Sequence, residues 1–140
     1  MGQEWMQAAC CREIIDLHTF FQGWLDGSLS NNAAVFARFA AATDPRFTLI
    51  GPDGSQAGFA ATAAWIQAAH GARPGFRLWT TDHTLLHQAG ECAVTTYREW
   101  QFLAGVTTVR ISTAVFRPAP DAPHGVAWLH VHETWLANAP

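Results

Sequence analysis

The spacing of the apolar residues changes once along the chain, near Pro74, and this change restricts the fold more than any other feature. Before Pro74, apolar side chains recur every three or four residues, as on one face of a helix. After Pro74 they alternate with polar side chains, as on strands whose two faces meet different surroundings. Helices followed by strands, without alternation of the two, predict an α+β fold with an antiparallel sheet in a single domain over residues 1–140.

Three helices and one short strand are predicted in the first half. The first helix runs from Glu4 to about Leu25, and Gly27 follows where a helix would stop. Capping side chains at residues 30–32 begin a second, shorter helix that ends before Asp44. A third helix runs from about Gly58 to Ala69, after a strand over residues 47–50.

Four long strands are predicted after Pro74: Phe76 to His87, Glu91 to Leu103, Val106 to Arg117 and Val126 to Leu136. The connections at residues 88–90 and 104–105 are short enough to be hairpin turns. Two-residue turns then fix the register: Glu99 opposite Arg110, Tyr97 opposite Ser112, Trp79 opposite Trp100, Thr80 opposite Glu99, and Asp82 opposite Tyr97.

This register separates two faces of the sheet by chemistry, because side chains alternate along a strand. One predicted face is polar and collects Thr80, Asp82, Thr95, Tyr97, Glu99, Gln101, Thr108, Arg110 and Ser112. The other is mainly apolar and collects Trp79, Leu85, Val94, Trp100, Val109 and Ile111, with Arg98 and His83 as its polar members. We expect one face to meet the helices and the other to be free for a partner, although the alternation does not say which.

Composition excludes several classes of protein. The chain is 49% hydrophobic with a net charge of −3, and its eight Lys and Arg form no basic stripe, which argues against nucleic-acid binding. No apolar run approaches the roughly 20 residues of a membrane helix. The three cysteines predict no disulfide framework, and the N-terminal residues lack a secretion signal, so we expect a cytoplasmic protein.

Two stretches resemble a known superfamily. The first is Arg110-Ile111-Ser112-Thr113-Ala114-Val115-Phe116-Arg117, followed after a loop by Gly125-Val126-Ala127-Trp128-Leu129-His130-Val131-His132; the second is the helix, short helix, strand and helix of the first half. In this order they resemble the nuclear transport factor 2-like superfamily, particularly its SnoaL-like members and the association domain of calcium/calmodulin-dependent kinase II. The resemblance implies a cone in which a curved sheet surrounds a pocket capped by helices. It also implies frequent dimerisation through the outer sheet face.

The polar face offers candidate ligand-binding residues. Glu99 opposite Arg110 is either a site for a polar or carboxylate group of a ligand or a structural ion pair between strands. A pocket built around this pair is predicted to be lined by Tyr97, Glu99, Arg110, Trp128, His130 and His132. We expect its ligand to be a small, mainly apolar molecule.

Three functions stay open at this point. The first is small-molecule binding without catalysis. The second is isomerase, dehydratase or cyclase chemistry of the SnoaL-like or ketosteroid-isomerase-like kind, with Asp82 or His132 as base and Tyr97 as electrophile. The third is a non-catalytic assembly domain. Trp79 and Trp100, predicted opposite each other, could form an aromatic wall for a ligand, but their place on the face opposite Arg110 favours the interface of a homodimer.

No metal or other cofactor is expected. His130 and His132 have the spacing of two metal ligands on one strand face, but no third ligand has supporting spacing, since Glu133 points to the opposite face. One of these histidines is expected to line the pocket instead. His18 lies one turn after Ile14, either pointing into the pocket or filling the edge of the core.

Overall fold

The computed structural model describes residues 3–137 and has three helices on a six-stranded sheet. The helices are α1 (Gln3–Asp26), α2 (Ala33–Ala41) and α3 (Phe59–Ala68). The strands are β1 (Thr43–Ile50), β2 (Gln56–Gly58), β3 (Arg77–Ala89), β4 (Cys92–Leu103), β5 (Val106–Pro118) and β6 (Val126–Trp135). The α+β class, the three helices and the four long strands predicted from the sequence are therefore confirmed.

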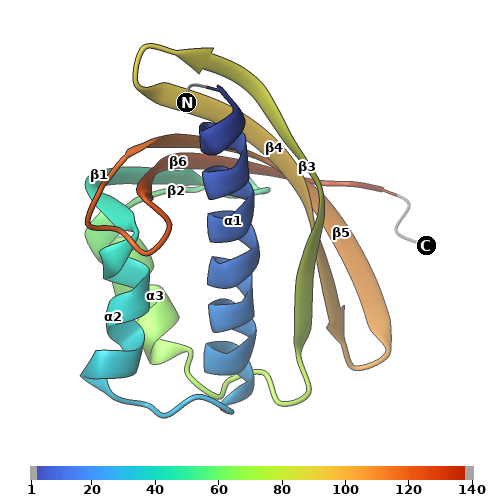
Figure 1. The fold of residues 1–140 in the computed structure, drawn as a ribbon. Coiled ribbons are helices and arrows are strands. Elements are labelled where there is room, and N and C mark those ends of the chain that lie inside the picture. The colour runs from blue at the N-terminus through green and yellow to red at the C-terminus, as the bar shows by residue number, and fades with distance from the viewer. Residues whose placement is uncertain (1–2, 138–140) are drawn as a thin grey trace.

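The sheet is mixed and open. Its strand order is β2-β1-β6-β5-β4-β3, and β1 runs parallel to β6 while the other neighbours are antiparallel. Figure 1 shows the long strands bending around α1, with α2 and α3 beside it near β1 and β2. Within residues 3–137, no helix is both long and apolar enough to cross a membrane.

Local chemistry explains where the helices begin and end. The side chain of Asn32 accepts a hydrogen bond from the amide of Val35 at 2.9 Å and so caps α2, as expected for this position. Helix α1 ends before Gly27, whose φ of +84° is open to glycine at little cost. A Cβ on Gly27 would lie 3.2 Å from the Cα of Gly71, so glycine also allows the segment after α3 to approach.

The first strand is longer than predicted, and β2 was not predicted at all. Strand β1 starts at Thr43 rather than at Phe47 and therefore contains Pro45. Pro45 lies where the ladder between β1 and β6 is interrupted, between Thr43 and Thr48. A proline is tolerated in that gap because no partner strand needs its missing N–H there. Strand β2 has only three residues, too few to show a repeating pattern.

Most of the predicted register is confirmed. Glu99 pairs with Arg110, Tyr97 with Ser112, Trp79 with Trp100 and Thr80 with Glu99. Asp82 does not form the regular pair with Tyr97 that was expected, because Asp82 and His83 form a β-bulge and together lie opposite Tyr97.

Two bulges in β3 also explain why a misplaced turn still gave the right pairs. The last pair of the β3–β4 ladder is Ala89 opposite Cys92, so the turn is formed by Gly90 and Glu91. The predicted register had placed the turn one residue earlier, at Ala89 and Gly90. Between this turn and Trp79, the two bulges add two extra residues to β3 that have no partner of their own on β4. These extra residues compensate for the one-residue error in the turn, so Trp79 still lies opposite Trp100. Leu85 now lies opposite Thr95 and packs against the core, so its predicted place on the face of Trp79 is corrected.

The core lies between α1 and the inner face of the sheet, by which we mean the side of Tyr97, Glu99, Arg110 and Ser112. Trp24 has no exposed surface, and its Nε1–H donates to the carbonyl of Ile66 at 2.8 Å, which ties α1 to α3. None of the three helices packs on the outer face, the side of Trp79, Arg98, Trp100 and Ile111. Thus the polar face predicted from the sequence is the one that meets the helices.

Candidate functional site

A cavity of about 470 Å³ lies between the three helices and the inner face of the sheet. Its walls are mostly aromatic and aliphatic, and three of its charged side chains gather where β4, β5 and β6 lie side by side, while Asp53 and Arg73 line it from loops. The aromatic lining residues are Phe21, Phe39, Phe47, Trp65, Phe76, Tyr97, Trp128 and Trp135. An apolar cavity with a few convergent polar groups is the usual form of a small-molecule site.

Arg110 is the centre of the polar group. One terminal nitrogen of its guanidinium lies 2.6 Å from Oε2 of Glu99 and 2.9 Å from Oε2 of Glu133. The three side chains come from adjacent strands, β4, β5 and β6, and all point to the inner face. The ring of Trp135 covers the guanidinium, with the carbon Cζ 5.3 Å from the ring centroid.

Glu99 has partners on both of its oxygens. Nε2 of His18 lies 2.9 Å from Oε1, and the side-chain amide of Gln101 donates to Oε2 at 2.7 Å. Nδ1 of His18 lies 2.7 Å from the carbonyl oxygen of Ile14. Because both nitrogens of His18 face acceptors, the ring satisfies both contacts only when each nitrogen carries a proton, unless Glu99 itself is protonated.

The two carboxyl groups on Arg110 have pKa values shifted in opposite directions. Glu99 is desolvated by burial, but Arg110 and the hydrogen bond from His18 outweigh that effect and lower its pKa to about 2. Burial raises the pKa of Glu133 to about 7, because Arg110 offsets the loss of solvent only in part and Glu99 adds repulsion. Glu133 can therefore gain or lose a proton near neutral pH while Glu99 stays ionised.

Tyr97 lies beside this group but is fully enclosed. Its ring makes edge contacts with His18 and Trp128, with centroid distances of 5.3 and 6.3 Å. Burial, together with repulsion from Glu99 and Glu133, raises the pKa of its phenol well above the ordinary value. The hydroxyl is therefore a hydrogen-bonding group in this cavity rather than an ionised one.

Four of the six predicted ligand-binding residues line the cavity: Tyr97, Glu99, Arg110 and Trp128. His130 and His132 do not, and the sequence-based placement of these two is corrected. His130 hydrogen-bonds to the hydroxyl of Thr48 at 2.7 Å, and His132 is exposed. Among the described residues, no three His, Cys, Asp or Glu side chains are placed to hold a metal ion.

The predicted catalytic group of Asp82, Tyr97 and His132 is not brought together. Asp82 lies at the bulge in β3 with a φ of +56°, and its side chain is 66% exposed, 3.9 Å from that of Arg98. His132 is turned away from the cavity because its neighbour Glu133 points inward. Tyr97 is thus the one member of the three that reaches the cavity.

Glu133, Trp65 and Trp135 are the site residues that sequence reasoning missed. The alternation along β6 correctly placed Glu133 on the opposite face from His132, but the histidine face was taken as the inner one. The pairing of Glu133 with Ser112 would have revealed it, yet the long loop between β5 and β6 fixes no register. Trp65 gave no signal, since an aromatic residue on a helix usually fills a core.

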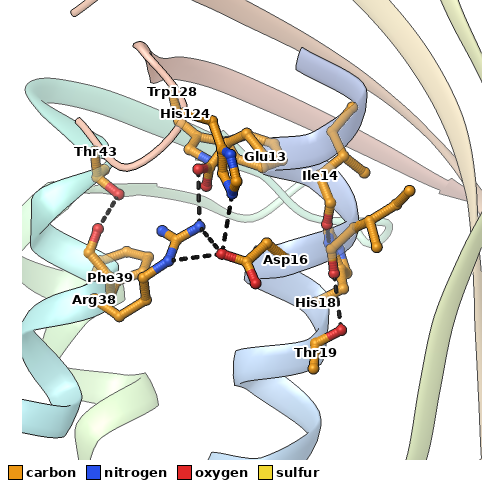
Figure 2. A network of polar contacts seen from close by, with 11 residues as sticks. Glu13, Ile14, Asp16, His18, Thr19, Arg38, Phe39, Thr43, His124 and Trp128 are labelled. Carbon is orange, nitrogen blue, oxygen red and sulfur yellow. Dashed lines mark hydrogen bonds and ion pairs between the residues drawn. The ribbon is translucent and has the colours of Figure 1, made fainter. Parts of the chain in front are cut away.

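A second polar network connects α1, α2 and the loop before β6 (Figure 2). Arg38 on α2 bonds to Glu13 at 2.8 Å and Asp16 at 3.1 Å, both on α1, and His124 contacts Asp16. The indole Nε1–H of Trp128 donates to Glu13 at 2.9 Å. This network holds Trp128, which lines the cavity, against α1.

Comparison with known proteins identifies relatives along nearly the whole chain. The family model "sucrose-6-phosphate phosphohydrolase C-terminal" matches residues 10–137. The chain is 27% identical over 136 residues to sucrose-phosphatase 2 of Nicotiana tabacum, a match that covers 91% of this chain and 31% of that protein. The chain thus spans about a third of the length of the curated relatives that it matches.

Solved structures confirm the fold that the sequence resembled. An NTF-2 like protein of unknown function from Pseudomonas aeruginosa has a TM-score of 0.82 and 27% identity, covering 92% of this chain and 99% of that one. The CamKII hub homology domain of Chlamydomonas reinhardtii has a TM-score of 0.68 and 18% identity, covering 93% and 98%. The chain therefore belongs to the sucrose-6-phosphate phosphohydrolase C-terminal family, and its fold is that of the nuclear transport factor 2-like superfamily.

Proposed function

We propose that this domain binds a small molecule in the cavity between the helices and the sheet. The observation that carries the proposal is the group of Glu99, Arg110 and Glu133 at the wall of an otherwise apolar cavity. Burying three ionisable side chains costs free energy that a purely structural core avoids by using apolar residues. Charged groups kept at the wall of a cavity, with shifted pKa values, are typical of binding and catalytic sites.

Exposed tryptophans support the same proposal. Trp65 and Trp135 line the cavity although 60% and 47% of their surface is exposed. Large aromatic side chains left open to solvent often mark a surface that a partner or ligand covers. The curated relatives are named sucrose-phosphatases, which makes sugars and sugar phosphates the first compounds to test.

The test is a titration followed by the indole N–H signals in an NMR spectrum. A panel of sugars, sugar phosphates and small apolar compounds is added to the purified protein. Binding in the cavity shifts the signals of Trp65, Trp128 and Trp135 and leaves those of Trp79 and Trp100 on the outer face unchanged. The proposal fails if no compound binds, or if the shifts are confined to the outer face.

Self-association through the outer face is a second candidate function. Trp79 is 41% exposed and stacks on Trp100 at 6.2 Å with 4° between the ring planes, and Ile111 beside them is 38% exposed. A second copy of the chain would cover this apolar surface, in keeping with the similarity to a CamKII hub homology domain.

Sedimentation equilibrium tests the second candidate. The substitution Trp79→Glu would place a charge in the interface and is expected to yield a monomer. Trp65→Glu, which changes an exposed tryptophan on α3, is the matched control and is expected to leave the mass unchanged. A monomeric native protein, or a Trp79→Glu dimer, would contradict association through this face.

A further inference from the structure

At the wall formed by β4, β5 and β6, the charged groups that a ligand can reach are one cation and one carboxyl side by side. The side chain of Arg110 is 19% exposed and that of Glu133 is 10% exposed, whereas Glu99 keeps only 4%. Glu99 is also surrounded by His18, Arg110 and Gln101. A ligand therefore meets the guanidinium of Arg110 and the carboxyl group of Glu133, not an isolated positive charge.

This pairing discriminates between kinds of polar group. A carboxylate or phosphate could accept hydrogen bonds from Arg110, but it would lie beside Glu133 and near Glu99, and like charges repel strongly in a poorly solvated site. A hydroxyl group has both a donor and two acceptor lone pairs. Neighbouring hydroxyls can therefore accept from Arg110 and donate to Glu133 together, without adding charge.

The walls of the cavity favour a ligand with an apolar face. Trp65 and Trp135 present their rings at the cavity although each is at least 47% exposed, and Trp135 also lies over Arg110. The C–H groups on one side of a sugar ring form an apolar surface that packs against an indole, while its hydroxyls lie around the edge. The volume of about 470 Å³ lies within the usual range for small-molecule sites, about 300 to 1,000 Å³.

We infer that the cavity takes a neutral, hydroxyl-rich ligand of mono- or disaccharide size, whose ring packs on Trp65 and Trp135 and whose hydroxyls bond to Arg110 and Glu133. The inference rests on the proposed ligand-binding role. It replaces the carboxylate-bearing ligand expected from the sequence, because Glu99 and Glu133 already occupy the guanidinium that such a group would need. An anionic ligand would bind well only with a proton on Glu133.

A matched pair of sugars tests the charge preference. Isothermal titration calorimetry at pH 8 compares sucrose with sucrose 6-phosphate, which differ by one phosphate group. We expect the neutral sugar to bind at least tenfold more tightly than its phosphate. If the phosphate binds more tightly, the inference is overturned, and Arg73 at the cavity lining becomes the cation to examine.

Variants then connect the affinity to named side chains. Trp65→Ala and Trp135→Ala each should weaken binding of the neutral sugar at least fivefold, whereas Trp79→Ala on the outer face should leave it unchanged. Glu133→Gln should bring the affinity for sucrose 6-phosphate closer to that for sucrose, because it removes the adjacent negative charge. Equal effects of Trp79→Ala and Trp65→Ala would overturn the placement of the sugar.

Further compounds distinguish a failure of the sugar inference from a failure of ligand binding in general. Sucrose is one neutral sugar, so glucose, fructose, trehalose and maltose are titrated under the same conditions. If no neutral sugar binds but an apolar compound shifts the indole signals of the cavity tryptophans, the sugar inference fails and ligand binding stands. If no compound of any class binds, both fail.

Discussion

The pH dependence of stability should change when Glu133 is replaced by glutamine, which keeps the shape of the side chain and removes its charge. Burial raises the pKa of Glu133 to about 7 in the folded protein, against an ordinary value of 4.5 that we take for the unfolded chain. Between these values the folded state holds a proton that the unfolded state has lost. The contribution of Glu133 to the free energy of unfolding therefore falls as the pH rises.

The size of the effect follows from the two pKa values. Each pKa unit is worth about 1.4 kcal/mol, and integration between pH 5 and pH 8 gives a fall of about 2 to 3 kcal/mol in the contribution of Glu133 to the free energy of unfolding. Glu133→Gln has no proton to lose at this position. Between pH 5 and pH 8 the variant should therefore gain about 2 to 3 kcal/mol in free energy of unfolding relative to the native protein, on top of any pH-independent difference from the changed contact with Arg110.

Urea denaturation followed by circular dichroism at pH 5, 6, 7 and 8 measures this difference directly. Asp82→Asn, which changes an exposed carboxylate outside the cavity, is the control and should follow the native protein at every pH. A difference between Glu133→Gln and the native protein that stays constant within about 0.5 kcal/mol, or that changes in the opposite direction, would refute the assignment of a buried, weakly compensated carboxyl group.

Three further substitutions test the contacts that hold the helices in place. Asn32→Ala removes the cap of α2 and should lower the free energy of unfolding by about 1 kcal/mol, whereas Asn32→Ser should restore most of it in urea titrations. Gly27→Ala forces a side chain into positive φ, 3.2 Å from Gly71, and should cost about 1 to 3 kcal/mol in thermal melts; an unchanged melting temperature would contradict the close approach. Trp24→Phe removes the indole N–H that donates to the carbonyl of Ile66, which keeps only the amide of Ala69, and it also leaves space in the core; it should cost about 1 to 3 kcal/mol, with faster hydrogen exchange in α3 than in β4.

Of the three residues in the polar cluster, Glu99 and Arg110 could be predicted as a pair from local sequence, but Glu133 could not. Glu99 and Arg110 could be paired because a two-residue turn joins β4 to β5, and such a turn fixes the register along both strands. Glu133 could not be added to them, because the seven-residue segment between Pro118 and Val126 sets no register between β5 and β6. The third member of the cluster is therefore a consequence of how the sheet closes around the core.

For Asp82, the alternation of side chains along a strand predicted a side chain on the inner face, whereas the side chain is exposed. Alternation alone places Asp82 on the same face as Tyr97, but a bulge with φ of +56° at Asp82 shifts the register between them. Nothing in the local sequence marks this bulge. Bulges arise where a long strand must bend, and the bend here follows the packing of the sheet around α1.

Local sequence patterns were enough to predict the class of fold, the three helices, the four long strands and the separation of the sheet into a polar and an apolar face. Each of these depends on periodicity or on turn chemistry within a short stretch of chain. No local pattern shows that the polar face is the inner one, that Glu133 shares Arg110 with Glu99, or that Asp82 and His132 lie outside the cavity. These outcomes depend on contacts between strands far apart in the sequence, where the packing of α1 against a bent sheet sets both the register and the direction of each side chain.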